Sequence, residues 1–237
     1  MKKFLVSLAS IAVVVIVCIF IARSGSAPTA EELTRQYPDI SSNSTIPENP
    51  KILCPFLRMM HRAGIVELQS SVLEITNGAQ ELGCGMLECG GVAAKVSKGQ
   101  DVKLKSGFGP IDLTQLHQAD GVAHDCGFTF AKGGQEVDSA TRQASLDLMK
   151  EKATKEGHLS FENILEVKKE ICRSQGVTMS EPGFVEVKLI YGYLGGVDRG
   201  YVHLEDVRKL FHAEMPTGKT TEWIRFKLFK AMPEAPL

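Results

Sequence analysis

Apolar residues recur at helical spacing over most of this 237-residue chain, and this pattern constrains the fold more than any other feature. Runs that alternate apolar and polar residues, which would indicate strands, are few. The pattern therefore predicts a mainly α fold with a single helical domain. The helices expected from it cover residues 55–65, 66–80, 112–121, 138–155, 161–172, 184–194 and 204–213.

The N-terminus has the pattern of a secretory signal. Lys2 and Lys3 precede an apolar or weakly polar run over residues 4–22, and small residues follow it. The run is nearly long enough to span a bilayer, so an uncleaved signal anchor is the alternative. In both cases the rest of the chain enters the secretory pathway and is secreted or stays anchored at a membrane through residues 4–22. The sequon Asn43-Ser44-Thr45 is compatible with that compartment as a glycosylation site.

Composition divides the chain into three parts. Residues 1–23 form the signal peptide or anchor, and residues 24–50, rich in Ser, Pro and Thr, are expected to be an extended lead-in. Residues 51–237 form the folded domain. The formal net charge is -1 and the basic residues are scattered, so nothing suggests binding to nucleic acid. The short cluster Lys168-Lys169 is interpreted as part of a solvated helix face.

The cysteine count leaves one thiol to explain. Of six cysteines, Cys18 lies in the apolar N-terminal run, and the odd number that remains leaves one unpaired in an oxidising compartment. Cys84 and Cys89 are close enough for a local bridge. The chain has no Cys-x-x-Cys pair and no His-x-x-x-His spacing, so a structural zinc site is not indicated. Cys54 is the best placed to be the unpaired thiol.

Cys54 ends the apolar stretch Ile52-Leu53 and is followed by Pro55, which suits the first turn of a helix. The N–H groups and macrodipole at a helix N-terminus stabilise a thiolate and lower the thiol pKa. A thiolate is a metal ligand or a nucleophile, whereas the alternative is an inert buried cysteine or half of a disulfide.

Four motifs occur in a fixed order between residues 51 and 223. They are Cys54-Pro55-x-Leu57 with Gly64 ten residues after the cysteine, Ile111-Asp112-Leu113 leading through Leu116-His117 to Val122-Ala123-His124-Asp125, His158-Leu159-Ser160 before Phe161-Glu162 and a helix ending Cys172-Arg173, and Leu210-Phe211-x-x-Glu214-x-Pro216 with Trp223. In order and spacing these motifs resemble the heme-thiolate peroxidases, the family of chloroperoxidase and the fungal unspecific peroxygenases.

The resemblance implies a single helical domain of chloroperoxidase type around one heme b. Cys54 would be the proximal iron ligand, with Pro55 and Leu57 beside the cofactor, and thiolate donation favours O–O cleavage. His124 matches the histidine of the family's E-H-D motif, which positions a catalytic Glu. The alternative for His124 is a hydrogen-bonded loop or core histidine.

The catalytic carboxylate is expected on a later helix, where Glu186 lies in an apolar segment. A carboxylate there is costly unless it is paired, and burial raises its pKa toward a useful range. The alternative places Glu186 and Lys188 on the wet edge of a helix, and Glu162 and Glu181 are the reserve candidates.

Two departures concern a Mg or Mn site that family members have near a heme propionate. Ala123 stands where the family has Glu, and Gly127 stands near the position of a Ser. A hard cation prefers oxygen ligands, which neither side chain offers. Leu53, Arg58 and Ala63 also differ from the family pattern and are expected to change packing more than ligation. Phe108, Phe128 and Phe130 are candidates for the core or for an access channel.

The sequence therefore predicts a secreted or membrane-anchored heme-thiolate peroxidase or peroxygenase. It would use hydrogen peroxide to oxidise or oxygenate a small organic substrate, with Cys54 on iron and with His124 and Glu186 handling the proton. One alternative is a non-catalytic, disulfide-stapled helical binding domain anchored at a membrane. Another is a thiol-based redox protein with Cys54 as nucleophile and His61 as the nearby base.

Overall fold

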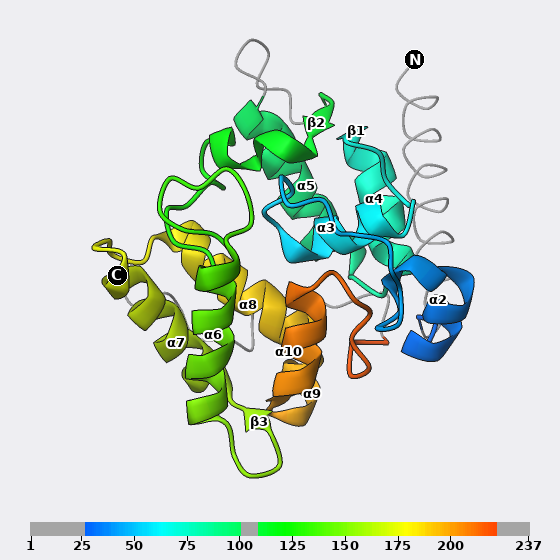
Figure 1. The fold of residues 1–237 in the computed structure, drawn as a ribbon. Coiled ribbons are helices and arrows are strands. Elements are labelled where there is room, and N and C mark those ends of the chain that lie inside the picture. The colour runs from blue at the N-terminus through cyan, green and yellow to red at the C-terminus, as the bar shows by residue number, and fades with distance from the viewer. Residues whose placement is uncertain (1–26, 101–108, 222–237) are drawn as a thin grey trace, which may run out of the picture.

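The computed structural model describes residues 27–100 and 109–221, and within them the protein is mainly α-helical, as predicted (Figure 1). The α-helices are α2 (Ala30–Gln36), α3 (Pro55–Arg62), α4 (Val72–Glu81), α5 (Met86–Gln100), α6 (Ser139–Lys152), α7 (Phe161–Ser174), α8 (Glu181–Tyr193), α9 (Gly196–Arg199) and α10 (Leu204–Phe211). Two 3-10 helices are η1 (Pro38–Ile40) and η2 (Leu113–Gln118).

The strands are short and pair in two antiparallel ribbons. β1 (Gln69–Ser70) pairs with β2 (Ile111–Asp112), and β3 (His158–Leu159) pairs with β4 (Val202–His203). Each ribbon joins segments that are more than forty residues apart in the chain. The ribbons therefore fix long connections rather than forming a sheet layer.

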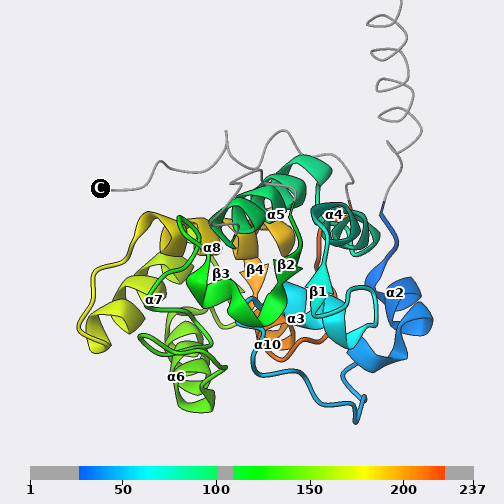
Figure 2. The same ribbon diagram turned by 90° about the horizontal axis from the view of Figure 1, so that it is seen from above.

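Helices α3 and α10 contact each other, and α10 also packs on α6. Figures 1 and 2 both show α2 on one side of the molecule and α6 with α7 on the opposite side. α4 packs on α5, α6 packs on α7, and α7 packs on α8. One contiguous core runs through these layers, with fully buried side chains such as Ile52, Met59, Phe128, Val167 and Phe211.

Local caps explain where the helices begin. Ser160 and Asn163 form a capping box at α7, and Asp138 accepts a hydrogen bond from the Thr141 N–H at α6, so both predicted starts are confirmed within a residue. The helix predicted from residue 66 begins later, at Val72. Ser71 caps that helix, and the residues before Ser71 pair with β2 instead.

The prediction of an extended segment over residues 24–50 is wrong for part of its length. Thr29 and Glu32 form a capping box that starts α2, and η1 follows directly. Leu33 and Ile40 are completely buried, so these elements belong to the core. The helix α5 was not predicted, because the glycines at positions 83, 85, 90 and 91 left this segment without an assignment.

Predictions for residues 1–23, for the anchor over residues 4–22, and for Phe108 and Trp223 fall outside the described residues. Over residues 27–100 and 109–221, no helix is long and apolar enough to cross a membrane.

Two disulfides link Cys84 to Cys89 and Cys126 to Cys172. Cys54 is the free cysteine among the described residues. The prediction that Cys54 carries the unpaired thiol is therefore confirmed.

Replacing Cys126 and Cys172 by Ala should lower the free energy of unfolding by about 4 kcal/mol, because their bridge closes a long loop of the unfolded chain. The sequence separation is 46 residues, against 5 for the Cys84–Cys89 bridge. The same replacement at Cys84 and Cys89 should cost only about 2 kcal/mol. Denaturant titration of both variants checks this order, and equal losses would contradict it.

Candidate active site

One cavity brings together all three residues to which chemistry was assigned from the sequence. Cys54 comes from the start of α3, His124 from the loop between η2 and α6, and Glu186 from α8. Pro55 and Leu57 line the same cavity. Its volume is about 220 Å³.

The cavity wall is otherwise almost wholly apolar. Phe56, Ile75, Val92, Phe130, Val185 and Ile190 contribute to it. Lys95, His117 and Tyr193 are the other ionisable side chains on the wall. A small apolar molecule or the face of a planar cofactor therefore suits the cavity better than a charged one.

Cys54 is the N-cap residue of α3, and its carbonyl oxygen accepts the first helical hydrogen bond from the Arg58 N–H at 2.9 Å. Burial raises the pKa of its thiol, whereas the N–H groups of Leu57 and Phe56 lower it and the Glu186 charge raises it further. The predicted low pKa is thus wrong, because desolvation in the apolar wall outweighs the helix N-terminus. Without a cationic ligand, Cys54 is a poorly activated nucleophile.

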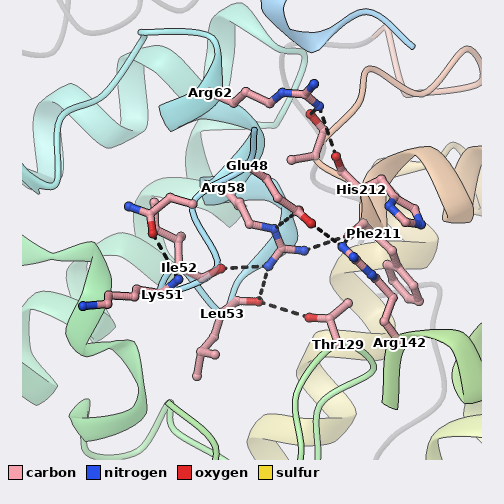
Figure 3. Close-up of polar contacts among 12 residues, drawn as sticks. Glu48, Lys51, Ile52, Leu53, Arg58, Arg62, Thr129, Arg142, Phe211 and His212 are labelled. Atoms are coloured by element: carbon pink, nitrogen blue, oxygen red, sulfur yellow. Dashed lines mark hydrogen bonds and ion pairs between the residues drawn. The ribbon is translucent and has the colours of Figure 1, made fainter. Parts of the chain in front are cut away.

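A completely buried arginine fixes the backbone that leads into Cys54. The Arg58 guanidinium donates to the carbonyl oxygens of Ile52 at 2.8 Å and Leu53 at 3.3 Å, immediately before the cysteine (Figure 3). It also donates to the Phe211 carbonyl oxygen at the end of α10, at 2.8 Å. Three segments of the chain are therefore held by one side chain.

Glu48 balances the charge of this arginine. Its carboxylate accepts from Arg58 Nε at 2.7 Å and from Arg142 of α6, which also donates to the Phe211 carbonyl oxygen at 3.2 Å. Burial acts to raise the pKa of Glu48, but the two guanidinium groups outweigh it and hold that pKa below its ordinary value. From the sequence, Arg58 was expected to change packing more than ligation, and its contacts agree with that expectation.

On another part of the wall, Glu186 lies between a histidine and a lysine. Its Oε2 is 3.7 Å from His124 Nε2, an electrostatic contact longer than a hydrogen bond, and the same oxygen accepts from Lys168 Nζ. Lys168 also donates to the Cys126 carbonyl oxygen, and its Nζ lies 4.8 Å from the centre of the Phe128 ring. The alternative of Glu186 on a wet helix edge is therefore wrong, and Lys188 is itself buried.

The burial of Lys168 contradicts the interpretation of Lys168-Lys169 as part of a solvated helix face. Lys169 is exposed, but the Lys168 side chain is completely buried. A signal for this was present in the sequence, because Lys168 is four residues after Ile164 and three before Ile171 on the apolar face of α7. The contacts of Arg58 had no such signal in the sequence, because its partners Glu48 and Phe211 lie outside its helix.

The loop that carries His124 is fixed next to Lys168. The Cys126–Cys172 disulfide ties this loop to α7, one turn after Lys168. Burial lowers the pKa of His124; the Glu186 charge raises it, and Lys168 lowers it. A neutral imidazole beside a paired carboxylate is an arrangement suited to moving a proton.

The other residues that were singled out in the sequence are exposed, belong to the core or only pack against the site. The reserve carboxylates Glu162 and Glu181 are exposed on their helices. Phe128 belongs to the core, and Phe130 is buried and lines the cavity. His61 is half-buried in the last turn of α3 and does not line the cavity.

The structure gives a physical reason for Gly127. A side chain at this position would collide with the ring of Phe130, so a Ser does not fit there. Ala123 adds only a methyl group to the wall. Within the described part of the chain, no group of three or more His, Cys, Asp or Glu side chains is arranged to hold a metal ion.

Comparison with known proteins does not assign a family. No protein-family model matches the chain, and no curated protein matches it either. The likeness to heme-thiolate peroxidases thus rests on the order and spacing of the four motifs.

Replacing Arg58 by Met should lower the free energy of unfolding by about 3 kcal/mol, because three buried carbonyl groups and Glu48 lose a charged donor. Arg62→Met is the matched control on the same helix. Arg62 is half-buried and makes only longer contacts to carbonyl oxygens, so about 1 kcal/mol is expected. Urea titration measures both losses, and a larger loss in Arg62→Met would refute the role of Arg58.

Acidification should destabilise the protein through His124. Its folded pKa lies below the ordinary 6.5, so the unfolded chain binds more protons as the pH falls through that value. The free energy of unfolding should therefore decrease from about pH 7.5 to about pH 5.5, and His124→Gln should flatten part of this decrease. His212, whose pKa burial also lowers, contributes with the same sign. A wild-type slope retained in His124→Gln would count against the assignment.

Proposed function

We propose that this protein is a heme-thiolate peroxidase or peroxygenase that uses hydrogen peroxide to oxidise or oxygenate a small organic substrate. The observation that carries the proposal is the convergence of Cys54, His124 and Glu186 on one apolar cavity. Cys54 and Glu186 lie 132 positions apart in the chain, with His124 between them, so proximity in the sequence does not explain why the three meet.

The donor set fits heme b. Cys54 is unpaired and lines the cavity at the start of a helix, so its sulfur would hold the iron. Pro55 and Leu57 offer apolar contacts next to it. The volume of about 220 Å³ is below the ~300–1,000 Å³ of common small-molecule sites, so wall side chains must move apart to admit the cofactor.

Thiolate-ligated heme supplies the cleavage of the O–O bond of hydrogen peroxide. The protein's own contribution is to move a proton between the two peroxide oxygens. The Glu186 carboxylate would accept the proton from one peroxide oxygen and donate it to the other. His124 and Lys168 hold that carboxylate at the wall from two sides.

The apolar wall favours an uncharged organic substrate. Phe56, Phe130 and Ile190 offer apolar contacts and no hydrogen-bonding group that would orient a polar molecule. Selection by shape and apolar contact is therefore expected.

The test is the absorption spectrum of heme-supplied protein, reduced and under carbon monoxide, for wild type and Cys54→Ser. A strongly red-shifted Soret band that disappears in the variant is expected, because sulfur donation shifts this band. His117→Gln is the matched control, since His117 is another potential iron ligand on the wall and its loss should leave the band in place.

Folded wild-type protein that binds no heme would overturn the proposal. It would favour the alternative of a stapled helical domain that binds apolar ligands without chemistry.

A further inference from the structure

A buried lysine whose charge contacts a cavity carboxylate needs a reason, because an ammonium group is costly to remove from water. Lys168 is completely buried, and its Nζ donates both to Glu186 Oε2 and to the Cys126 carbonyl oxygen. One ammonium group thus joins α8 to the loop of His124.

We propose that Lys168 is a positioning residue, which fixes the Glu186 carboxylate beside His124 and balances its charge. This inference rests on the proposed function for its catalytic consequence, but its electrostatic part stands on the ion pair itself. Lys168 touches neither peroxide nor substrate in this account, since it does not line the cavity.

Geometry gives Lys168 little freedom. The Cys126–Cys172 disulfide anchors the loop on α7 one turn away, and the Phe128 ring packs under Nζ at 4.8 Å. An unbranched apolar side chain such as Met would fill the same space, so the charge and the N–H donors are what lysine adds to packing.

The charged and titratable groups that face His124 determine its pKa, which is the quantity that the experiment measures. Glu186 faces it from α8, Lys168 from α7 and Asp125 from its own loop. Cys54, Lys95 and His117 share the cavity wall. Loss of the Lys168 charge leaves Glu186 as the dominant partner of His124 and favours the protonated imidazole.

The first measurement needs no cofactor. Imidazole NMR of the full chain gives the pKa of His124 in wild type, Lys168→Met and Lys169→Met. We expect an upward shift of about one unit in Lys168→Met and none in Lys169→Met, whose exposed side chain makes it the matched control. Lys168→Gln, which keeps an N–H donor without the charge, should give the same shift and serves if the Met variant does not fold.

The second measurement uses heme-supplied enzyme. We expect kcat to fall about 10- to 100-fold in Lys168→Met with KM little changed, and Lys168→Arg to restore part of it. An unchanged His124 pKa in the folded neutral variants would overturn the inference. Wild type that binds no heme would overturn the proposed function instead, while the NMR shift still decides whether Lys168 balances the pair.

Discussion

The Arg58 guanidinium is the contact on which the site depends most. It is buried completely and uses four donor contacts, one to the Glu48 carboxylate and three to backbone carbonyl groups. Buried carbonyl groups need partners, and the two residues before Cys54 have theirs in this side chain. The position of the sulfur is thus set by a side chain one turn further along the helix.

A second buried cation, Lys168, connects segments of the chain at another part of the wall. Lys168 joins Glu186 to the loop of His124, as Arg58 joins the Cys54 segment to α10. In both cases a basic side chain is stabilised by one carboxylate and by backbone oxygens. Ion pairs of this kind contribute little net stability, but they leave few alternative arrangements for the segments they connect.

Local chemistry explains which parts of the fold were predictable. The helices α6 and α7 have side-chain caps, α7 and α10 have apolar faces at helical spacing, and Cys54 was identified by its neighbour Pro55. α5 was missed because its glycines left the segment unassigned, although Gly90 suits close packing there: a Cβ at this position would lie only 3.1 Å from Thr76 Cγ2. Contacts between distant segments leave no such local pattern.

The charge near Cys54 distinguishes two hypotheses for the cavity, a site for an apolar ligand and a site for a metal centre bound to sulfur. The Cys54 sulfur and the Glu186 carboxylate share an apolar wall, and burial with the Glu186 charge raises the thiol pKa. An apolar ligand would leave this balance unchanged, and the thiol would stay protonated. A metal centre bound to sulfur would reverse it, because a coordinating thiol loses its proton outright. Burial and the Glu186 charge therefore both disfavour a thiolate on this wall, and the positive charge of the proposed iron would oppose them.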